Sequence, residues 1–262
     1  MSLSYWNGRL VPAEEVRIAP DDAGFLFGDG LFETLRVEGG RLRDLSAHLD
    51  RLLAGLERLG IGTPESRCDL GHAVSEVAKA SPRPLARLRI TISRGTVDGP
   101  TRLITASPYE PPGETVTAVL LMDSRIDSRS PLAGLKSLCY QQNRLALREA
   151  EARSAFEALL LNEHGRLAEG SRSNVALVLP EGILTPPESE GCLPGTVRRR
   201  LLEQGALRER PLTLEDLAAA DGLLLMNSLV GVLPVSRLDG RELPVGPEAA
   251  RLRGLLSPFR EI

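Results

Sequence analysis

The chain contains only two lysines, Lys79 and Lys136, among its 32 lysine and arginine residues. An arginine guanidinium stays protonated and cannot form a covalent bond with a carbonyl group, so few side chains can do amine chemistry. Lys136 lies between apolar residues in GLKSLCY. Partial desolvation favours the neutral, nucleophilic form of an amine. A lysine considered alone is more often a surface residue, so this environment makes Lys136 a candidate and no more.

Three other stretches place polar groups where a ligand can bind. In LAEGSRSN, Glu169 follows an apolar run and precedes small polar residues, although a turn with an incidental carboxylate has the same pattern. In CLPGTVRRR, Gly195 precedes a predicted helix whose first N–H groups favour anions. This stretch lacks the spacing of a nucleotide-binding loop. In MNSLVGVLPV, Asn227 and Ser228 offer further donors.

The composition is that of a globular protein. Of its 262 residues, 42% are hydrophobic and 26% are charged, and the formal net charge is -3. This balance is too apolar for a disordered chain and too acidic for a general nucleic-acid binder. The apolar runs are far shorter than the roughly 20 residues that span a bilayer, and the N-terminus has no secretory signal pattern. We therefore expect a soluble, cytoplasmic protein that binds neither nucleic acid nor membrane.

The three cysteines and three histidines do not form a recognisable metal or disulfide framework. Cys68, Cys139 and Cys192 are widely spaced and contain no C-x-x-C pair. The histidines are scattered along the chain, and we interpret them as structural, with His48 near the start of its helix. No metal site is expected.

The first part of the chain alternates predicted strands and helices. Hairpins are expected over 4–11, around Asn7-Gly8, and over 31–45. Leucines at helical spacing over 49–59 predict a helix with Ser46 as its N-cap and Gly60 at its end. A second helix over 70–80 and a strand over 85–93 follow, before four Pro and Gly residues within 108–113 mark a linker.

The second part mixes paired strands with helices. A strand is predicted over 116–122, then a helix carrying RLALREAEAR, and then hairpins over 158–169 and 175–185. Helices over 196–204 and 214–220 and a strand over 222–226 complete the pattern. We expect an α+β protein with an N-terminal domain over 1–110, a linker over 111–118 and a C-terminal domain over 119–262.

The motifs FGDG, HLDRL, SRG, GLKSL, EGSRSN, LPG-x-x-R and NSL occur in this order. Over nearly its whole length the sequence resembles the class IV aminotransferases, the fold-type IV enzymes that use pyridoxal 5'-phosphate. The resemblance implies an N-terminal α/β sandwich and a C-terminal barrel-like α/β domain, the latter binding the cofactor. It also implies that the site lies between the domains and takes residues from a second subunit, so that the protein is a homodimer.

The resemblance also implies a role for each motif residue. Lys136 is the catalytic residue, which forms a Schiff base with the cofactor and later moves the proton. Glu169 keeps the pyridine nitrogen protonated, which makes the ring an electron sink. Arg51 of HLDRL binds the phosphate. The further cofactor-binding candidates are Tyr140, Ser173, Asn174, Gly195, Thr196, Val197, Asn227 and Ser228. Two carry reservations: threonine is frequent in the family where Val197 stands, and Tyr140 also fits a half-buried helix position.

Within the family, two reactions fit. One is a lyase reaction of folate biosynthesis that converts 4-amino-4-deoxychorismate to 4-aminobenzoate and pyruvate through a Schiff base. The alternative is an aminotransferase reaction on D- or branched-chain amino acids. Both kinds of substrate carry carboxylates, so arginines are expected nearby. The substrate-binding candidates are Phe32, Arg36, Arg94 and Arg102.

Local departures from the family patterns weaken particular activities. Where D-amino acid aminotransferases carry an arginine and a histidine that bind the substrate carboxylate, this chain has Gly99 and Thr101. The lyases also tend to carry an arginine in this loop, so Gly99 weakens that activity too unless another arginine substitutes. The residues around the lysine differ from those of branched-chain aminotransferases. The lyase is the favoured prediction.

A protein of a different class has to be weighed against these enzymes. A non-enzymatic α/β module that binds a sugar or a phosphate at the helix after Gly195 fits the same weak signals. Such a module predicts a colourless protein, whereas the cofactor predicts a yellow one that depends on Lys136.

Overall fold

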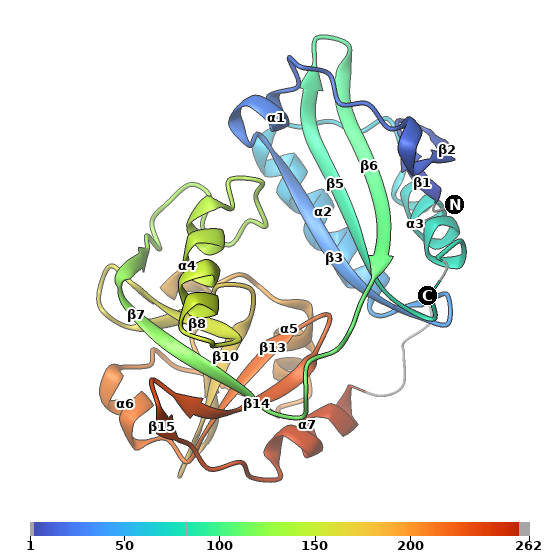
Figure 1. Cartoon of the computed structure of the whole chain (residues 1–262). Helices are drawn as coiled ribbons and strands as arrows, with labels where there is room; N and C mark the ends of the chain where they lie inside the picture. The colour runs from blue at the N-terminus through green and yellow to red at the C-terminus, as the bar shows by residue number, and fades with distance from the viewer. Residues whose placement is uncertain (1–2, 82, 257–262) are drawn as a thin grey trace. The chain divides into compact units, whose positions relative to one another are not determined.

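The computed structural model describes residues 3–81 and 83–256, and these residues form two units (Figure 1). Unit 1 contains the described residues up to Glu110 together with Leu135–Tyr140, and unit 2 contains Pro111–Gly134 and the described residues from Gln141 onwards. Lys136 therefore lies in unit 1, whereas the sequence placed it in a domain over 119–262. The reason is a short pairing of the lysine segment with a strand of unit 1, in which Leu31 bridges Ser137.

Unit 1 is built on a six-stranded antiparallel sheet in the order β2-β1-β6-β5-β3-β4. Its strands are β1 Leu3–Trp6, β2 Arg9–Pro12, β3 Gly30–Glu38, β4 Arg41–Leu42, β5 Leu85–Thr96 and β6 Gly99–Pro108. The predicted first hairpin is confirmed, and Asn7 and Gly8 have φ of 47° and 95°, as a tight two-residue turn requires. β5 continues beyond its predicted end and pairs with β6, a strand that the sequence did not predict.

Helices α2 Leu45–Leu59 and α3 Arg67–Lys79 pack against the sheet of unit 1, and the short elements η1 Ala13–Glu15 and α1 Ala23–Phe27 precede β3 (Figure 1). The leucines of α2 are buried against Leu35 and Ile90 of the sheet. Because side chains alternate along a strand, Phe32 and Arg36 lie on the opposite face of β3. The predicted N-cap Ser46 is wrong: the N-cap is Asp44, two residues earlier, and the helix begins at Leu45, so Ser46 lies inside it.

Unit 2 is built on a nine-stranded mixed sheet in the order β12-β11-β10-β13-β14-β7-β8-β9, with β15 paired to β14. Its strands are β7 Val116–Ile126, β8 Glu157–Asn162, β9 Leu167–Gly170, β10 Asn174–Leu179, β11 Gly182–Thr185, β12 Arg208–Glu209, β13 Gly222–Asn227, β14 Gly231–Leu238 and β15 Arg241–Glu242. β7 runs parallel to both β8 and β14, and β11 runs parallel to β12, whereas the two predicted hairpins, β8–β9 and β10–β11, are antiparallel.

The helices of unit 2 are α4 Gln141–Ala152, α5 Thr196–Glu203, α6 Leu214–Ala219 and α7 Glu248–Leu255, and η2 Glu188–Glu190 precedes α5 (Figure 1). The apolar run of β13 is buried on both faces. Leu223 and Leu225 join the cluster that includes α6, whereas Leu224 and Met226 join the cluster that includes α5 and α7. Burial on both faces explains why this strand is continuously apolar. The mixed α+β class is confirmed.

Among the described residues, no helix combines the length and apolar character that a membrane crossing needs.

Candidate active site

Lys136 is placed by the edge of strand β3. The backbone N–H of Phe32 donates to the carbonyl of Lys136 at 2.9 Å, which puts both side chains on the same face. The Lys136 Nζ atom lies 4.7 Å from the centroid of the Phe32 ring and 5.8 Å from that of the Tyr140 ring. The two rings meet edge to face, with centroids 5.2 Å apart. Unit 1 therefore brings together three of the predicted residues, and aromatic rings replace part of the water around the amine.

Arg51 is held by a buried carboxylate that the sequence reasoning missed. Its Nε and Nη2 atoms each lie 2.7 Å from a different oxygen of Glu33. The Nδ1 atom of His48 lies 2.6 Å from the same carboxylate. This paired geometry fixes the plane of the Arg51 guanidinium.

Glu33 is 1% exposed and points toward α2. Burial opposes its ionisation, but the charges of Arg51 and His48 outweigh burial and lower the pKa of Glu33 to about 2. A carboxylate only accepts hydrogen bonds, so His48 Nδ1 donates the proton. The sequence did carry one signal: Glu33 stands in phase with the buried residues Leu31 and Leu35 of its strand.

The structure does not gather the predicted substrate arginines around Lys136. Arg36 shares the face of Phe32, but its Nε donates to Glu38 at 2.5 Å. Arg94 pairs with Asp29. Arg102 pairs with Glu65 at 2.7 Å and stands opposite Ile92, so it lies on the face that α2 covers.

Arg89, which the sequence reasoning missed, lies on the same face of the sheet as Phe32 and Arg36. Arg89 lies on β5 opposite Thr34 of β3, and its guanidinium carbon lies 3.8 Å from the centroid of the Phe32 ring. Its Nε donates to Thr91. Within the described ranges, no carboxylate pairs with Arg89, and burial together with the charge of Arg87 lowers the pKa of its guanidinium. A half-buried cation without an acidic partner is a candidate for binding an anionic group of a substrate.

In unit 2, the EGSRSN and LPG segments are tied together. The backbone N–H of Leu193 donates to Glu169 Oε2 at 2.9 Å, and Asn174 Nδ2 donates to the Leu193 carbonyl at 2.8 Å. A Cβ atom on Gly195 would lie 1.9 Å from Asn174 Oδ1, so this position requires glycine. Helix α5 then begins at Thr196, with no side-chain cap at Gly195.

The turn after β13 reaches the same strand ends. Asn174 stands opposite Met226, and Asn227 follows Met226 directly. Asn227 Oδ1 accepts the N–H groups of Leu229 and Val230, and its Nδ2 donates to the carbonyl of Arg172. Unit 2 therefore brings together most of the predicted cofactor-binding residues: Glu169, Asn174, Gly195, Thr196, Val197, Asn227 and Ser228.

Ser173 has a different environment from the one expected of a cofactor contact. Its hydroxyl donates to Glu157 Oε2 at 2.7 Å, and the hydroxyl of Ser171 donates to the other oxygen of Glu157. Glu157 is fully buried, and burial raises its pKa although these hydrogen bonds oppose the rise. The sequence reasoning missed Glu157, which lies beneath the EGSRSN segment and holds it.

Comparisons with known proteins identify the family to which this chain is similar. Residues 30–238 match the sequence model of the class IV amino-transferase family. An aminodeoxychorismate lyase from Vibrio harveyi is 30% identical over 260 residues, covering 90% of this chain and 94% of the relative. A D-alanine aminotransferase from Bacillus licheniformis is 29% identical over 256 residues, covering 92% and 90%. The structure of a hypothetical aminotransferase from Mycobacterium tuberculosis in its PLP-bound form has a TM-score of 0.87 and 29% identity, covering 97% of each chain.

Proposed function

The chain belongs to the class IV aminotransferase family, and we propose that within this family it is a lyase that converts 4-amino-4-deoxychorismate to 4-aminobenzoate and pyruvate. The fold-type IV architecture and the cofactor pyridoxal 5'-phosphate, both predicted from the sequence, are confirmed. The proposal concerns the reaction and the residues that perform it.

Of the three arginines on the face of Phe32, Arg36 pairs with Glu38, and the other two carry the proposal of a lyase. Arg87 and Arg89 project from the same face of β5, and neither has a carboxylate partner among the residues that the structure describes. The lyase substrate has two carboxylates, whereas a branched-chain amino acid has one carboxylate and an apolar side chain. Two cations therefore suit the lyase substrate better. We assign Arg89 the carboxylate nearer the amine because it contacts Phe32, the ring that Lys136 also contacts.

The residues of the chain suit pyridoxal phosphate by the chemistry of their donors. Lys136 provides the amine for the aldehyde, Glu169 the carboxylate for the pyridine nitrogen, and the start of α5 the backbone N–H groups for the phosphate. Arg51, oriented by Glu33, adds a cation for the phosphate. When bound, the cofactor supplies an electron-withdrawing ring that stabilises negative charge at the substrate carbon.

Lys136 is proposed to act twice. Its amine first holds the cofactor, and after the substrate amine has replaced it, the freed Lys136 takes the proton from the acidic carbon of the substrate. Phe32 and Tyr140 exclude water from the amine. In the lyase reaction the loss of this proton would be followed by cleavage of the ring carbon–oxygen bond to the enolpyruvyl group, which would take up a proton to become pyruvate and leave an aromatic ring. An aminotransferase would instead keep the carbon skeleton of its substrate and exchange the amine for a keto group.

An aminotransferase is the second candidate, supported by the relatives that carry this activity. One local observation weighs against the D-amino acid reaction. Thr101, which stands where those enzymes have a carboxylate-binding residue, donates its hydroxyl to Asp22 at 2.5 Å. The side chain is thus engaged within unit 1 and carries no positive charge.

A homodimer in the cytoplasm, acting in folate biosynthesis, completes the proposal. The exposed apolar side chains of α1 support the dimer: Phe25 and Phe27 are 71% and 73% exposed. Neighbouring apolar side chains that remain this exposed are typical of a surface that another protein covers.

The cofactor roles are tested by the visible absorption spectrum of the purified protein after incubation with pyridoxal phosphate. We expect a yellow protein whose visible band is lost in Lys136→Ala and retained in the matched control Lys79→Ala, since Lys79 is an exposed residue paired with Glu76. A wild-type protein that takes up no pyridoxal phosphate would contradict the assignment.

The reaction is tested by incubating the loaded enzyme with aminodeoxychorismate and measuring pyruvate and 4-aminobenzoate. We expect both products in equal amounts, and a KM raised about tenfold or more in Arg89→Gln because a charge-assisted hydrogen bond is lost. If neither product forms, but a keto acid restores the visible band after the enzyme has reacted with a D- or branched-chain amino acid, the aminotransferase is the correct assignment.

A further inference from the structure

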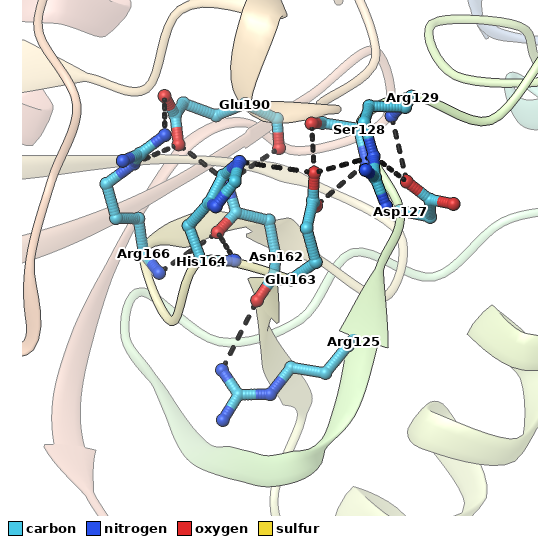
Figure 2. Close-up of polar contacts among 9 residues, drawn as sticks. All are labelled: Arg125, Asp127, Ser128, Arg129, Asn162, Glu163, His164, Arg166 and Glu190. Carbon is cyan, nitrogen blue, oxygen red and sulfur yellow. Dashed lines mark hydrogen bonds and ion pairs between the residues drawn. The ribbon is translucent and has the colours of Figure 1, made fainter.

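The turn between β8 and β9, residues Asn162 to Arg166, contacts two segments of unit 2 that lead to proposed cofactor residues (Figure 2). The first is the segment 126–130, which begins at the last residue of β7 and precedes Lys136 in the chain. The second is the segment 188–193, which precedes α5. We refer to residues 162–166 as the clamp turn.

The clamp turn holds the second segment through Glu190. The Nε and Nη2 atoms of Arg166 lie 2.5 and 2.8 Å from the two oxygens of the Glu190 carboxylate, and Asn162 Nδ2 donates to it at 2.6 Å. Glu190 is 3% exposed and Asn162 is fully buried. The Oδ1 atom of Asn162 accepts the backbone N–H groups of His164 and Arg166, so its amide is fixed by the turn in which it lies.

The clamp turn holds the first segment through Glu163. The Glu163 carboxylate accepts the backbone N–H of Ser128 at 3.0 Å and the Ser128 hydroxyl at 2.6 Å. Figure 2 shows Glu163 directed toward Ser128 and Arg129, and Glu190 directed toward Arg166. Adjacent residues of one turn therefore hold two segments that are distant in the sequence.

The two segments also pack directly against each other. Gly191 follows Glu190 and has a φ of 92°. A Cβ atom at Gly191 would lie 2.8 Å from Ile126 Cγ2 and 3.1 Å from the Cα atom of Ser128, so a larger residue would push the segments apart. Two residues further on, the N–H of Leu193 donates to Glu169. Glu190 therefore lies three residues before the backbone N–H that contacts Glu169, the carboxylate of the proposed cofactor site.

We propose that Asn162, Arg166 and Glu190 are positioning residues of the cofactor site, which set the Leu193 N–H against Glu169 and fix the start of α5. The inference rests on the proposed cofactor roles of Glu169 and Thr196. A buried ion pair adds little net stability compared with apolar residues of the same size, but it defines one geometry. The clamp turn therefore contributes more to the position of the segment than to the stability of unit 2.

The experiment compares Glu190→Gln with Asp216→Asn. The control breaks another paired carboxylate of unit 2, which Arg210 contacts through two nitrogens and which lies outside both segments. Hydrogen–deuterium exchange of the protein without cofactor, the dissociation constant of pyridoxal phosphate and urea unfolding are measured for each variant. In Glu190→Gln we expect exchange over 191–196 and the dissociation constant to rise about tenfold, the effect of losing a charge-assisted hydrogen bond. In the control, exchange over 191–196 and the dissociation constant stay at wild-type values, although the urea midpoint falls because an ion pair is lost there too.

Two results would overturn the inference. One is wild-type exchange over 191–196 in Glu190→Gln, and the other is a dissociation constant that changes equally in both variants. If Glu190→Gln does not fold, Arg166→Lys makes the same test, because it keeps the charge but removes the paired geometry at a partly exposed position. Failure of the wild-type protein to bind pyridoxal phosphate would instead overturn the proposed function, and the exchange measurement separates these two failures.

Discussion

Two buried carboxyl groups lie beneath proposed cofactor residues, and their ionisation is shifted in opposite directions. Glu33 of unit 1 is 1% exposed and Glu157 of unit 2 is fully buried. The pKa of Glu33 is lowered to about 2, whereas burial raises the pKa of Glu157. Both accept several hydrogen bonds, so the number of bonds does not explain the difference.

The difference comes from the charge of the donors. Glu33 is bound by the guanidinium of Arg51 and by His48. The positive charge of Arg51, in direct contact with the carboxylate, compensates for the solvation that Glu33 loses on burial. Glu157 is bound by two serine hydroxyls and the N–H of Ala158, which are neutral dipoles. In unit 1 the carboxylate thus balances and orients a cation, while in unit 2 the carboxyl group anchors a loop.

Glu33→Gln should produce the largest effect, because it leaves the Arg51 guanidinium partly buried without its anion. Removing one partner of a buried ion pair costs about 3 kcal/mol or more. We expect this loss in the free energy of unfolding of unit 1, measured with urea at pH 7 on the protein without cofactor. Asp50→Asn is the matched control, since Asp50 lies on α2 next to Arg51 and pairs with Arg67 at an exposed position. Exposed ion pairs contribute about 1 kcal/mol or less to stability.

The pH dependence of this loss provides a second check on the same variant. A carboxyl group whose pKa is lowered in the folded state stabilises the protein above its ordinary pKa, and the contribution disappears as the pH falls from about 4.5 toward 2. The difference between wild type and Glu33→Gln should therefore shrink over this range. A difference that stays constant between pH 5 and 2.5 would show that the charge of Glu33 is not its cause.

Glu157→Gln should change the free energy of unfolding less than Glu33→Gln does, and the change should depend on pH in the opposite direction. When folding raises the pKa of a carboxyl group, the folded protein binds the additional proton, so the free energy of unfolding falls as the pH rises above about 4.5. Glutamine cannot ionise, which removes this fall. We expect Glu157→Gln to lose on the order of 1 kcal/mol at pH 5 through a changed hydrogen bond and to gain relative to wild type as the pH is raised to 8. Urea unfolding at three pH values measures this gain, and parallel curves for the two proteins would contradict it.

The sequence predicted those features of the fold and site that local patterns determine. Asn7-Gly8 specifies its hairpin, the leucines of α2 specify a helix, and the scarcity of lysine leaves one credible residue within the motifs. Strand β6 was missed because Pro100 and its many polar residues obscure the alternation. The N-cap was assigned to Ser46 because the sequence does not show where the preceding strand ends.

Buried charges were missed for another reason. Glu33 contacts Arg51 and His48 because strand β3 packs against helix α2. Glu157 contacts its two serines because strands β8 and β9 pair as a hairpin. In the sequence a buried glutamate cannot be distinguished from a surface one until its partners are known. The same limit applies to Arg102, because only the register opposite Ile92 reveals the face on which it lies.

Ser173→Ala should produce the smallest effect and tests whether neutral donors set the behaviour of Glu157. The variant removes one hydroxyl donor but leaves Ser171, the N–H of Ala158 and the backbone bond from Gly170 to the Ser173 carbonyl. The loss in free energy of unfolding should be about 1 kcal/mol, the usual net contribution of a hydrogen bond.

The informative part of this variant is again the pH dependence. The bond from Ser173 opposes the rise in the pKa of Glu157, so its removal should raise that pKa further and make the stability fall more steeply between pH 5 and 8. The same substitution made in Glu157→Gln should cost a similar amount at every pH, because no ionisable group remains. Ser75→Ala, which removes a hydroxyl that donates to the carbonyl of Gly71 within a helix of unit 1, is the matched control and should show no pH dependence. If Ser173→Ala is equally flat, the hydroxyl does not influence the ionisation of Glu157, and the raised pKa results from burial alone.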